Sequence, residues 1–326
     1  MTAGVVTTTN DLTDSLIADL IDLPQVIDAC QQAFEGVGRG EILNPAREQT
    51  LAVRDGLDYF GLDMPAEWPG HCRSRKIIEE YSDVAAGRLA RREAYLRFDD
   101  LATGTSLRLD AGLITDMRTG AAGALGVKYL ASRTIERVAI LGTGRVCRHL
   151  ALAADQVFAL KQIRCTSRSE ANRQTFAAAV EPQLRTSLSM TDSIDACVKE
   201  VDAVLMAVPT PEPIIDVNQL RGVDTIAVIA GDSRTRQVSQ PVLCGRPVVV
   251  DHYEQAQVSG EFLQAREQAT EHRIALVRDS AGEVMTMADA ACGRIAATGG
   301  TIYLTGMAAQ DLCTAARVVE NWMATQ

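Results

Sequence analysis

The sequence predicts an α/β fold in two parts, and three observations carry that prediction. An apolar run near the middle of the chain ends in Gly142 and Gly144, and a helix-compatible run follows. Strand and helix candidates then alternate toward the C-terminus, which is typical of a parallel sheet. Between residues 41 and 110, short β-like runs are instead separated by turns. We therefore expect a Rossmann-type doubly wound parallel sheet and an α+β domain.

The N-terminal part is expected to hold a helical segment and then a mixed or antiparallel sheet. Apolar residues recur at helix-like spacing from residue 11 to about residue 37. The polar stretch 79–92 is expected to be a surface excursion. We assign 1–118 to a substrate-binding and dimerisation domain. The strand candidates are 49–53, 57–62, 76–78, 93–98 and 106–109.

The C-terminal part is expected to alternate strands and helices after an Ala- and Gly-rich helix at 115–132. The last amphipathic helix, at about 309–323, is expected to return to the first domain. We assign 119–305 to the dinucleotide-binding domain and 306–326 to the returning segment. The strand candidates are 138–141, 162–166, 203–207, 225–230, 248–251 and 274–276.

The glycine turn has the chemistry of a dinucleotide-binding site. Gly142 permits the tight turn, and Gly144 lets the backbone approach a pyrophosphate with no Cβ in the way. The N–H groups at the start of the following helix then point at the anion. Cys147 fills the third small position of the fingerprint. Because the turn lies mid-chain, substrate binding is expected to come largely from the first ~120 residues.

Composition disfavours several classes of function. The 326 residues carry a net charge of −10, so neither nucleic acid nor an anionic membrane is an expected partner. No leader and no apolar run of membrane-spanning length stands out, and we expect a cytoplasmic protein. The eight cysteines lack a C-x-x-C pair and indicate reduced, mostly buried thiols. The four histidines, His149 among them, show no metal-ligand spacing, so no metal is expected.

Seven short motifs, in order from about residue 11 to residue 322, resemble the ornithine cyclodeaminase/mu-crystallin family. Any one of them alone would be weak, and their common order carries the resemblance. They are Asn44-Pro45-Ala46-Arg47; Met64-Pro65 with Lys76; Thr103-Gly104 and Leu109-Asp110 with 114–122; Gly142-Thr143-Gly144; Ala230-Gly231-Asp232; Val250-Asp251 with Gly260-Glu261; and Tyr303-Leu304-Thr305-Gly306 with Gln310-Asp311.

The resemblance implies that Arg47, Lys76 and Arg118 hold the carboxylate of an amino or imino acid. The chemistry is suitable, because Arg offers a bidentate fork and Lys a point charge. Ordinary surface ion pairs are the alternative for Arg47 and Lys76. That alternative is weaker for Arg118, because it lies in an otherwise uncharged helical run, where an unpaired cation is costly unless it faces a site.

The resemblance also implies that Asp232 is the catalytic acid or base, with Lys76 beside it in the catalytic group. Asp232 follows the strand candidate 225–230 at the carboxyl edge of the predicted sheet, where open α/β sheets bind ligands. An aspartate there can exchange a proton with a substrate nitrogen. The alternative is a turn aspartate beside Gly231.

The predicted cofactor is NADP or NAD, with NADP favoured. The strand candidate 162–166 runs into Ser167-Arg168, without the acid that usually holds the ribose of NAD, and Glu170 comes later. Serine and arginine suit a 2′-phosphate. The predicted cofactor-binding residues are Thr119, Gly142, Thr143, Gly144, Arg145, Val146, Ser167, Arg168, Val208, Asp232 and Thr305.

The resemblance leaves three functions open. The first is an NAD(P)-dependent oxidoreductase that reduces the C=N bond of a small 2-imino acid, a ketimine-reductase type of amino/imino-acid dehydrogenase. The second is an ornithine/lysine cyclodeaminase with bound NAD. The third is a non-catalytic, NADPH-binding, mu-crystallin-like protein. Cyclodeaminases of the family carry a Glu shortly before Met-Pro, where this chain has Leu62, or Asp63 if the register slips by one.

Two further expectations concern the predicted first domain. Arg73 and Arg75 add positive charge next to Lys76, which would suit a second substrate carboxylate. Strand alternation, however, directs Arg75 away from the side of Lys76. The resemblance also implies a homodimer formed through the sheet of this domain.

Overall fold

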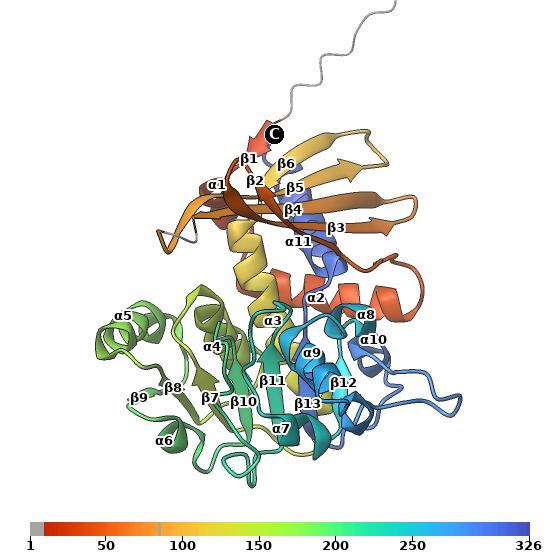
Figure 1. The fold of residues 1–326 in the computed structure, drawn as a ribbon. Helices are drawn as coiled ribbons and strands as arrows, with labels where there is room; N and C mark the ends of the chain where they lie inside the picture. The colour runs from red at the N-terminus through yellow and green to blue at the C-terminus, as the bar shows by residue number, and fades with distance from the viewer. Residues whose placement is uncertain (1–9, 84–85) are drawn as a thin grey trace, which may run out of the picture. The chain divides into compact units, whose positions relative to one another are not determined.

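A computed structural model describes residues 10–83 and 86–326, which fall into two compact units (Figure 1). Unit 1 contains the described residues of Met1–Thr115 together with Met307–Gln326, and unit 2 is Asp116–Gly306. Arg118, which the sequence places at the end of the first domain, belongs to unit 2 by this division. The substrate and dimerisation roles assigned from sequence stay predictions.

Unit 1 is a six-stranded mixed sheet with helices packed against it. The strand order is β1-β6-β5-β4-β3-β2, with β1 and β6 parallel and the other neighbours antiparallel. The C-terminal helix α11 (Ala308–Met323) contacts β3, β4 and β5 and also α2 (Leu23–Gly38). The strands are β1 (Asn10–Leu12), β2 (Glu48–Arg54), β3 (Leu57–Trp68), β4 (Cys72–Asp83), β5 (Arg88–Asp100) and β6 (Ser106–Asp110).

The N-terminal helical segment is two helices rather than one. The chain forms β1, then α1 (Asp14–Leu20), and then α2. Asp22 interrupts the helical run with extended backbone angles, and its carboxylate accepts the N–H of Gln25 while the Gln25 side chain accepts the N–H of Asp22. This capping box and the proline in the first turn of α2 explain the break.

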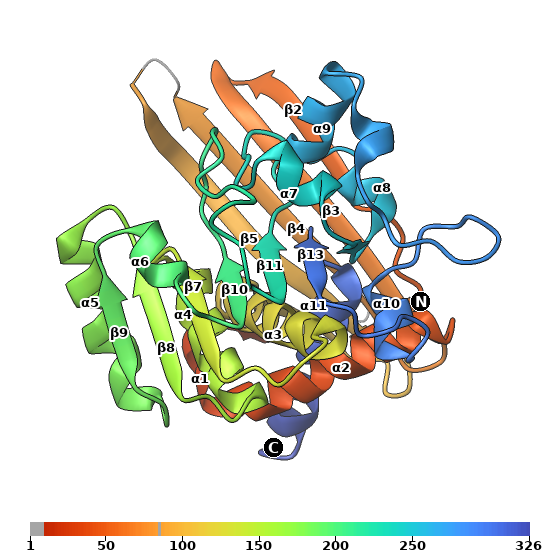
Figure 2. The same cartoon turned by 90° about the horizontal axis from the view of Figure 1, so that it is seen from below.

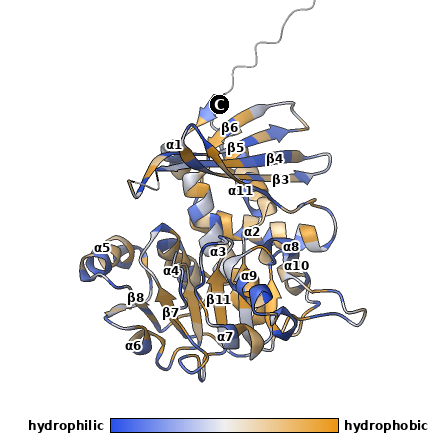
Figure 3. Ribbon diagram, viewed as in Figure 1, coloured by the Kyte–Doolittle hydropathy of each residue, from blue (hydrophilic) through white to orange (hydrophobic). Residues whose placement is uncertain are grey.

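Where the structure describes it, the stretch 79–92 is polar and largely exposed, as expected of a surface excursion, but it is formed by strands. Strands β4 and β5 continue through most of this stretch as a polar hairpin arm, and Figure 3 shows hydrophilic colour along β4. Cross-strand contacts account for the polar residues: Arg92 Nε donates to Glu80 Oε1 at 2.9 Å, and the Arg91 guanidinium lies 4.1 Å from the centre of the Tyr81 ring. Such pairs stabilise a ladder that lacks apolar alternation.

Unit 2 contains the expected doubly wound sheet, which has seven strands, all parallel. The order is β12-β13-β11-β10-β7-β8-β9, and Figure 2 shows this row of strands from below. Both faces are buried, which explains the nearly continuous apolar strand sequences. The strands are β7 (Arg137–Leu141), β8 (Gln162–Thr166), β9 (Leu188–Thr191), β10 (Ala203–Met206), β11 (Thr225–Ile229), β12 (Val248–Val250) and β13 (Gly300–Leu304).

One predicted strand of unit 2 is wrong, and two strands were not predicted. Residues 274–276 make only an isolated bridge, between Leu276 and Val248, because the N–H of Ala275 donates to Leu243 in the neighbouring helix. The unpredicted strands are β9, which is short and partly polar, and β13, which begins with glycine and threonine. β9 has no apolar run, and in β13 the apolar run is limited to the last three residues, Ile302, Tyr303 and Leu304.

The helices of unit 2 cover both faces of the sheet. One face packs against α6, α7 and α9, and the other against α3 (Gly112–Leu130) and α4 (Arg145–Val157). Glycines let α3 approach α4 closely: a Cβ at Gly120 would lie 2.4 Å from the carbonyl carbon of His149. The remaining helices are α5 (Glu170–Val180), α6 (Ile194–Val198), α7 (Gln240–Cys244), α8 (Tyr253–Ala256), α9 (Gly260–Glu267) and α10 (Met287–Ala291), with 3-10 turns at Glu181–Gln183 and Glu271–Arg273.

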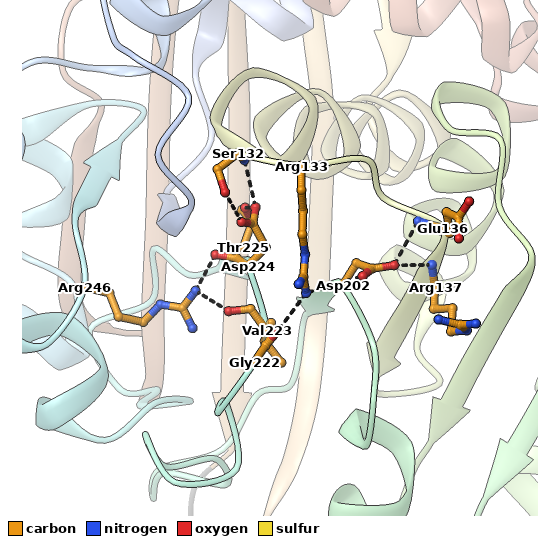
Figure 4. A network of polar contacts seen from close by, with 10 residues as sticks. All are labelled: Ser132, Arg133, Glu136, Arg137, Asp202, Gly222, Val223, Asp224, Thr225 and Arg246. Carbon is orange, nitrogen blue, oxygen red and sulfur yellow. Dashed lines mark hydrogen bonds and ion pairs between the residues drawn. The ribbon is translucent and has the colours of Figure 1, made fainter.

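At the amino edge of this sheet, two aspartates accept backbone N–H groups from the segment that leads into β7 (Figure 4). Asp202 accepts the N–H groups of Glu136 and Arg137, both at 2.9 Å, and Asp224 accepts the N–H of Ser132 at 3.0 Å. These bonds fasten the segment between α3 and β7 to the starts of β10 and β11. The amino edge is therefore structural, and the candidate ligand site lies at the carboxyl edge.

Among the helices of the described segments, none combines the length and apolar character that crossing a membrane would require.

Candidate functional site

The glycine turn lies at the carboxyl end of β7 and has the geometry of an anion cradle. Gly142 has φ 110°, and a Cβ there would lie 2.8 Å from Cys147 Sγ. Gly144, the residue before α4, has ordinary backbone angles and open space where a Cβ would stand. No side chain caps this helix start, so the first-turn N–H groups are available to a pyrophosphate. The residues therefore fit a dinucleotide.

Cys147 has a packing role beneath this turn. Its thiol is fully buried and lies 3.5 Å from the carbonyl oxygens of Leu141 and Ala207. Burial raises the pKa of the Cys147 thiol to about 12, so it is protonated at neutral pH and is not a nucleophile. The departure from glycine at this position is therefore compatible with the fold. None of the eight cysteines, all of which lie in the described segments, forms a disulfide; Cys244 and Cys292 are partly exposed and the other six are buried.

The first five residues of α4 include three that bear on the site. Arg145 is mostly exposed, and its Nε lies 3.4 Å from Asp116 Oδ2 on α3. Val146 follows it at the mouth of the turn. Burial, and then the nearby charges of Arg148 and Arg145, lower the pKa of His149 to about 4, so its imidazole is neutral at neutral pH. Within 10–83 and 86–326, no group of three or more metal-ligating side chains occurs.

The carboxyl end of β8 presents Ser167 and Arg168. Arg168 is exposed, and the Ser167 carbonyl accepts a hydrogen bond from Arg173 Nη1 at 2.6 Å. Glu170, the first acid after β8, accepts from Gln174 Nε2 at 3.2 Å, so its carboxylate is directed along α5. The strand end is therefore basic in character, as the sequence predicts.

Asp232 lies in the loop after β11 and pairs with Arg234. The Asp232 side chain is 31% exposed, and its two oxygens receive Arg234 Nε at 2.9 Å and Nη2 at 2.5 Å. The N–H of Arg234 also donates to Asp232 Oδ1 at 2.8 Å. Asp232 therefore stabilises its own turn, as expected of a turn aspartate, while its carboxylate stays accessible at the carboxyl edge. A role in the turn is thus compatible with a role as acid or base.

Arg118 is held against the turn that follows β13. Its side chain is buried, and a Cβ at Gly306 (φ 89°) would lie 2.8 Å from Arg118 Nη1. Asp251, at the end of β12, fixes this turn by accepting the N–H groups of Thr305 and Gly306 and the Thr305 hydroxyl, at 2.7–2.9 Å. Glycine at 306 therefore leaves room for the guanidinium. Thr119, the next residue of α3, is also buried.

Unit 1 holds Lys76 in a buried ion pair. Lys76 Nζ lies 2.6 Å from Asp311 Oδ2, and the two side chains are 1% and 0% exposed. Asn44, in the first motif, caps α11 by accepting the N–H of Ala309 at 2.7 Å. This bond helps to place Asp311, two residues further along α11, opposite β4. Arg47 is half-buried in the segment before β2.

The strand register decides between Leu62 and Asp63. Met64 is directly paired with Lys76, and Leu62 with Ile78, so Leu62 shares the face of Lys76. Asp63 points to the other face and binds the Arg75 guanidinium there. The residue on the Lys76 face is therefore the apolar Leu62, and the Asp63 carboxylate is directed away from that face.

The expectation that Arg73 and Arg75 serve a second substrate carboxylate beside Lys76 is wrong. Both guanidinium groups lie on the exposed face, where Arg73 pairs with Asp99 and Arg75 with Asp63. The expected alternation explains this placement, because Ser74 and Lys76 are buried while Arg73 and Arg75 are exposed.

Unit 2 brings most of the predicted cofactor residues to one edge. Thr143, Ser167, Val208, Asp232 and Thr305 each follow a different parallel strand at its carboxyl end. The sequence analysis gave no role to the buried residues that hold the site residues in place.

In unit 2 these are Asp251, Glu261 and Gln237, and in unit 1 Asp311 holds Lys76. All of them except Gln237 stand in the seven motifs, which was the signal available in the sequence.

The two units define a class of protein with a Rossmann-type dinucleotide fold and a separate mixed-sheet unit. The family model described as "Ornithine cyclodeaminase/mu-crystallin family" matches residues 10–326, and the chain belongs to this family. The resemblance seen in the sequence is confirmed.

Three known proteins are similar over nearly the whole chain. Ketimine reductase mu-crystallin of Rattus norvegicus is 24% identical and covers 96% of both chains. A solved structure of an archaeal alanine dehydrogenase dimer with bound NAD has a TM-score of 0.80 at 21% identity, over 97% of both chains. Δ1-pyrroline-2-carboxylate reductase of Thermococcus litoralis, solved with NADH and L-proline, has a TM-score of 0.81 at 20% identity, over 97% of this chain and 98% of that one.

We predict that Asp311→Ala destabilises unit 1 strongly. The substitution leaves the Lys76 charge buried without its carboxylate, which costs about 3–5 kcal/mol in the free energy of unfolding. Urea denaturation measures the loss. Asp63→Ala is the matched control, because it removes the carboxylate that pairs with Arg75, the exposed neighbour of Lys76 on β4. This loss should cost ~1 kcal/mol or less. Equal losses in the two variants would contradict the account.

Proposed function

We propose that the protein is an NAD(P)-dependent oxidoreductase that reduces the C=N bond of a small 2-imino acid. The observation that carries the proposal is the carboxyl edge of unit 2, where the open cradle at Gly144 and the accessible carboxylate of Asp232 follow strands of one parallel sheet. A ketimine reductase, an alanine dehydrogenase and an imine-reducing enzyme that resemble the chain over nearly its whole length support it.

The residues have distinct roles in this proposal. A bound nicotinamide supplies the hydride that reduces the imine carbon. Arg118, with Arg47 and Lys76, binds the substrate carboxylate, and Lys76 belongs to the catalytic group. Asp232 gives a proton to the substrate nitrogen during reduction and accepts one in the reverse direction. Arg234 Nε and Nη2 donate to the two carboxyl oxygens of Asp232 and hold this group at the carboxyl edge of the sheet.

The cofactor is held by the glycine turn and by the ends of the neighbouring strands. The first-turn N–H groups of α4 bind the pyrophosphate, with Thr143, Arg145 and Val146 around it. Thr119, Val208 and Thr305 are the further residues that would contact the cofactor. At the ribose, Ser167 and Arg168 favour NADP over NAD, and the first acid after β8, Glu170, bonds to Gln174 along α5.

A cyclodeaminase is the second candidate within the same family. It would release ammonia from ornithine or lysine without net consumption of the cofactor. Leu62 on the Lys76 face speaks against it, because no carboxylate stands at that position to bind a distal amine. A non-catalytic NADPH-binding protein would instead bind the cofactor tightly without turnover. The accessible Asp232 favours an enzyme over a binder.

We further propose that the protein is a homodimer. The described dimer of the similar archaeal alanine dehydrogenase supports this assembly.

The central prediction is turnover with imines. Purified protein should oxidise NADPH or NADH, followed by the absorbance of the reduced nicotinamide, with at least one 2-oxo acid plus ammonia or methylamine, or with a cyclic imine. Asp232→Asn should lower kcat about a hundredfold or more, because the proton donor is lost. Asp279→Asn, at an exposed turn of unit 2, is the control and should keep full activity. No turnover with any compound, or full activity in Asp232→Asn, would contradict the assignment.

The cofactor preference rests on Arg168. Arg168→Ala should weaken NADPH binding about ten- to a hundredfold, the effect of losing a charge-assisted contact to phosphate, and should leave NADH binding unchanged. Cofactor fluorescence titration measures both affinities. Arg221→Ala, an exposed arginine at the amino edge of the sheet, should change neither. An equal loss for the two cofactors would show that Arg168 does not read the 2′-phosphate.

A further inference from the structure

A single buried amide spans the carboxyl ends of two neighbouring strands of unit 2. Gln237 is 2% exposed and stands in the loop that carries Asp232. Its Oε1 accepts the N–H of Val208 at 2.7 Å, and its Nε2 donates to the carbonyl of Ile229 at 2.6 Å. Val208 follows β10 and Ile229 ends β11. The amide therefore joins a predicted cofactor-binding segment to the strand that leads into Asp232.

Glu261 holds the backbone from which this amide projects. Its Oε1 accepts the N–H of Gln237 at 2.6 Å, and its Oε2 accepts the hydroxyl of Tyr303 at 2.6 Å. The Tyr303 hydroxyl in turn lies 2.7 Å from the Ser259 hydroxyl. The Glu261 side chain is buried, and this burial raises the pKa of its carboxyl. Three strands, β10, β11 and β13, are thus joined through one carboxyl group and one amide.

The start of α9 also contacts the loop directly. The N–H of Gly260 donates to the carbonyl of Asp232 at 3.3 Å, and a Cβ at Gly260 would lie 2.0 Å from the Thr235 carbonyl oxygen. Only glycine permits this approach. Gly260 and Glu261, the first two residues of α9, therefore both hold the loop that carries Asp232. Gly260 allows close contact because it has no side chain, and Glu261 binds the loop through its carboxyl group.

We propose that Glu261 is a positioning residue that, through Gln237, fixes Asp232 relative to the strand end at Val208. This inference rests on the proposed function, because it concerns the placement of the proton donor. Glu261 does not touch substrate or cofactor in this account. Its effect appears in the chemical step, since a displacement of about 1 Å can cost a hundredfold in rate. It leaves the carboxylate-binding cations untouched, so substrate affinity is spared.

The decisive comparison is between Glu261→Gln and Glu261→Ala. A glutamine can accept the N–H of Gln237 and bond to the Tyr303 hydroxyl, so Glu261→Gln should keep kcat within about threefold of wild type. Glu261→Ala breaks the hydrogen bonds to Gln237 and Tyr303 and should lower kcat about ten- to a hundredfold, with the KM for imine and the Kd for NAD(P)H near wild type. Full activity in Glu261→Ala, or an equal loss in Glu261→Gln, would overturn the proposal.

Hydrogen exchange tests the same inference without turnover. Backbone amides of 231–239, followed by mass spectrometry, should exchange faster in Glu261→Ala and at the wild-type rate in Glu261→Gln. Gln237→Leu, which keeps the side-chain volume, should reproduce the faster exchange and serves if the alanine variant does not fold. Unchanged exchange in these two loss variants would overturn the inference even in an active enzyme. If the wild-type protein shows no turnover but the exchange rates change as expected, the proposed function is refuted and the structural role of Glu261 is not.

Discussion

Buried charge and its partners are the constraint on which the candidate site depends. Lys76 is tolerated inside unit 1 because Asp311 lies 2.6 Å away on α11, and α11 is held in place by Asn44. Removing a charge from water costs several kcal/mol unless a partner compensates it. The pair therefore ties the last helix to the central strand of the sheet, and it fixes where the lysine amine lies.

Unit 2 uses the same physics in a different form. Asp251 and Glu261 are buried carboxyl groups that accept backbone N–H groups from loops at the carboxyl edge. Asp251 fixes the turn at Gly306 that lies against Arg118, and Glu261 fixes the loop that carries Asp232. Loops are usually the mobile part of an α/β enzyme. Here the acids give the loops a defined geometry, which the proposed proton and hydride transfer would require.

The sequence alone predicted the doubly wound sheet and its glycine turn, because long apolar strands and paired glycines are strong local signals. It missed β9, whose residues are partly polar, and β13, whose apolar run is limited to Ile302, Tyr303 and Leu304. It did not predict strands in 79–92, because cross-strand pairs such as Arg92 with Glu80 are invisible in one strand. The supporting acids were missed for a similar reason. Lys76 and Asp311 are 235 residues apart, so only the tertiary structure shows that they are partners.

The central claim is that hydride passes from the reduced cofactor to the imine carbon of a 2-imino acid. Incubation of the protein with cofactor deuterated at C4 of the nicotinamide, followed by mass spectrometry of the product, tests it most directly. The account predicts an amino acid that carries deuterium on its α-carbon. An amino acid formed without the label, or a cyclised product formed with release of ammonia and no net use of cofactor, would contradict it.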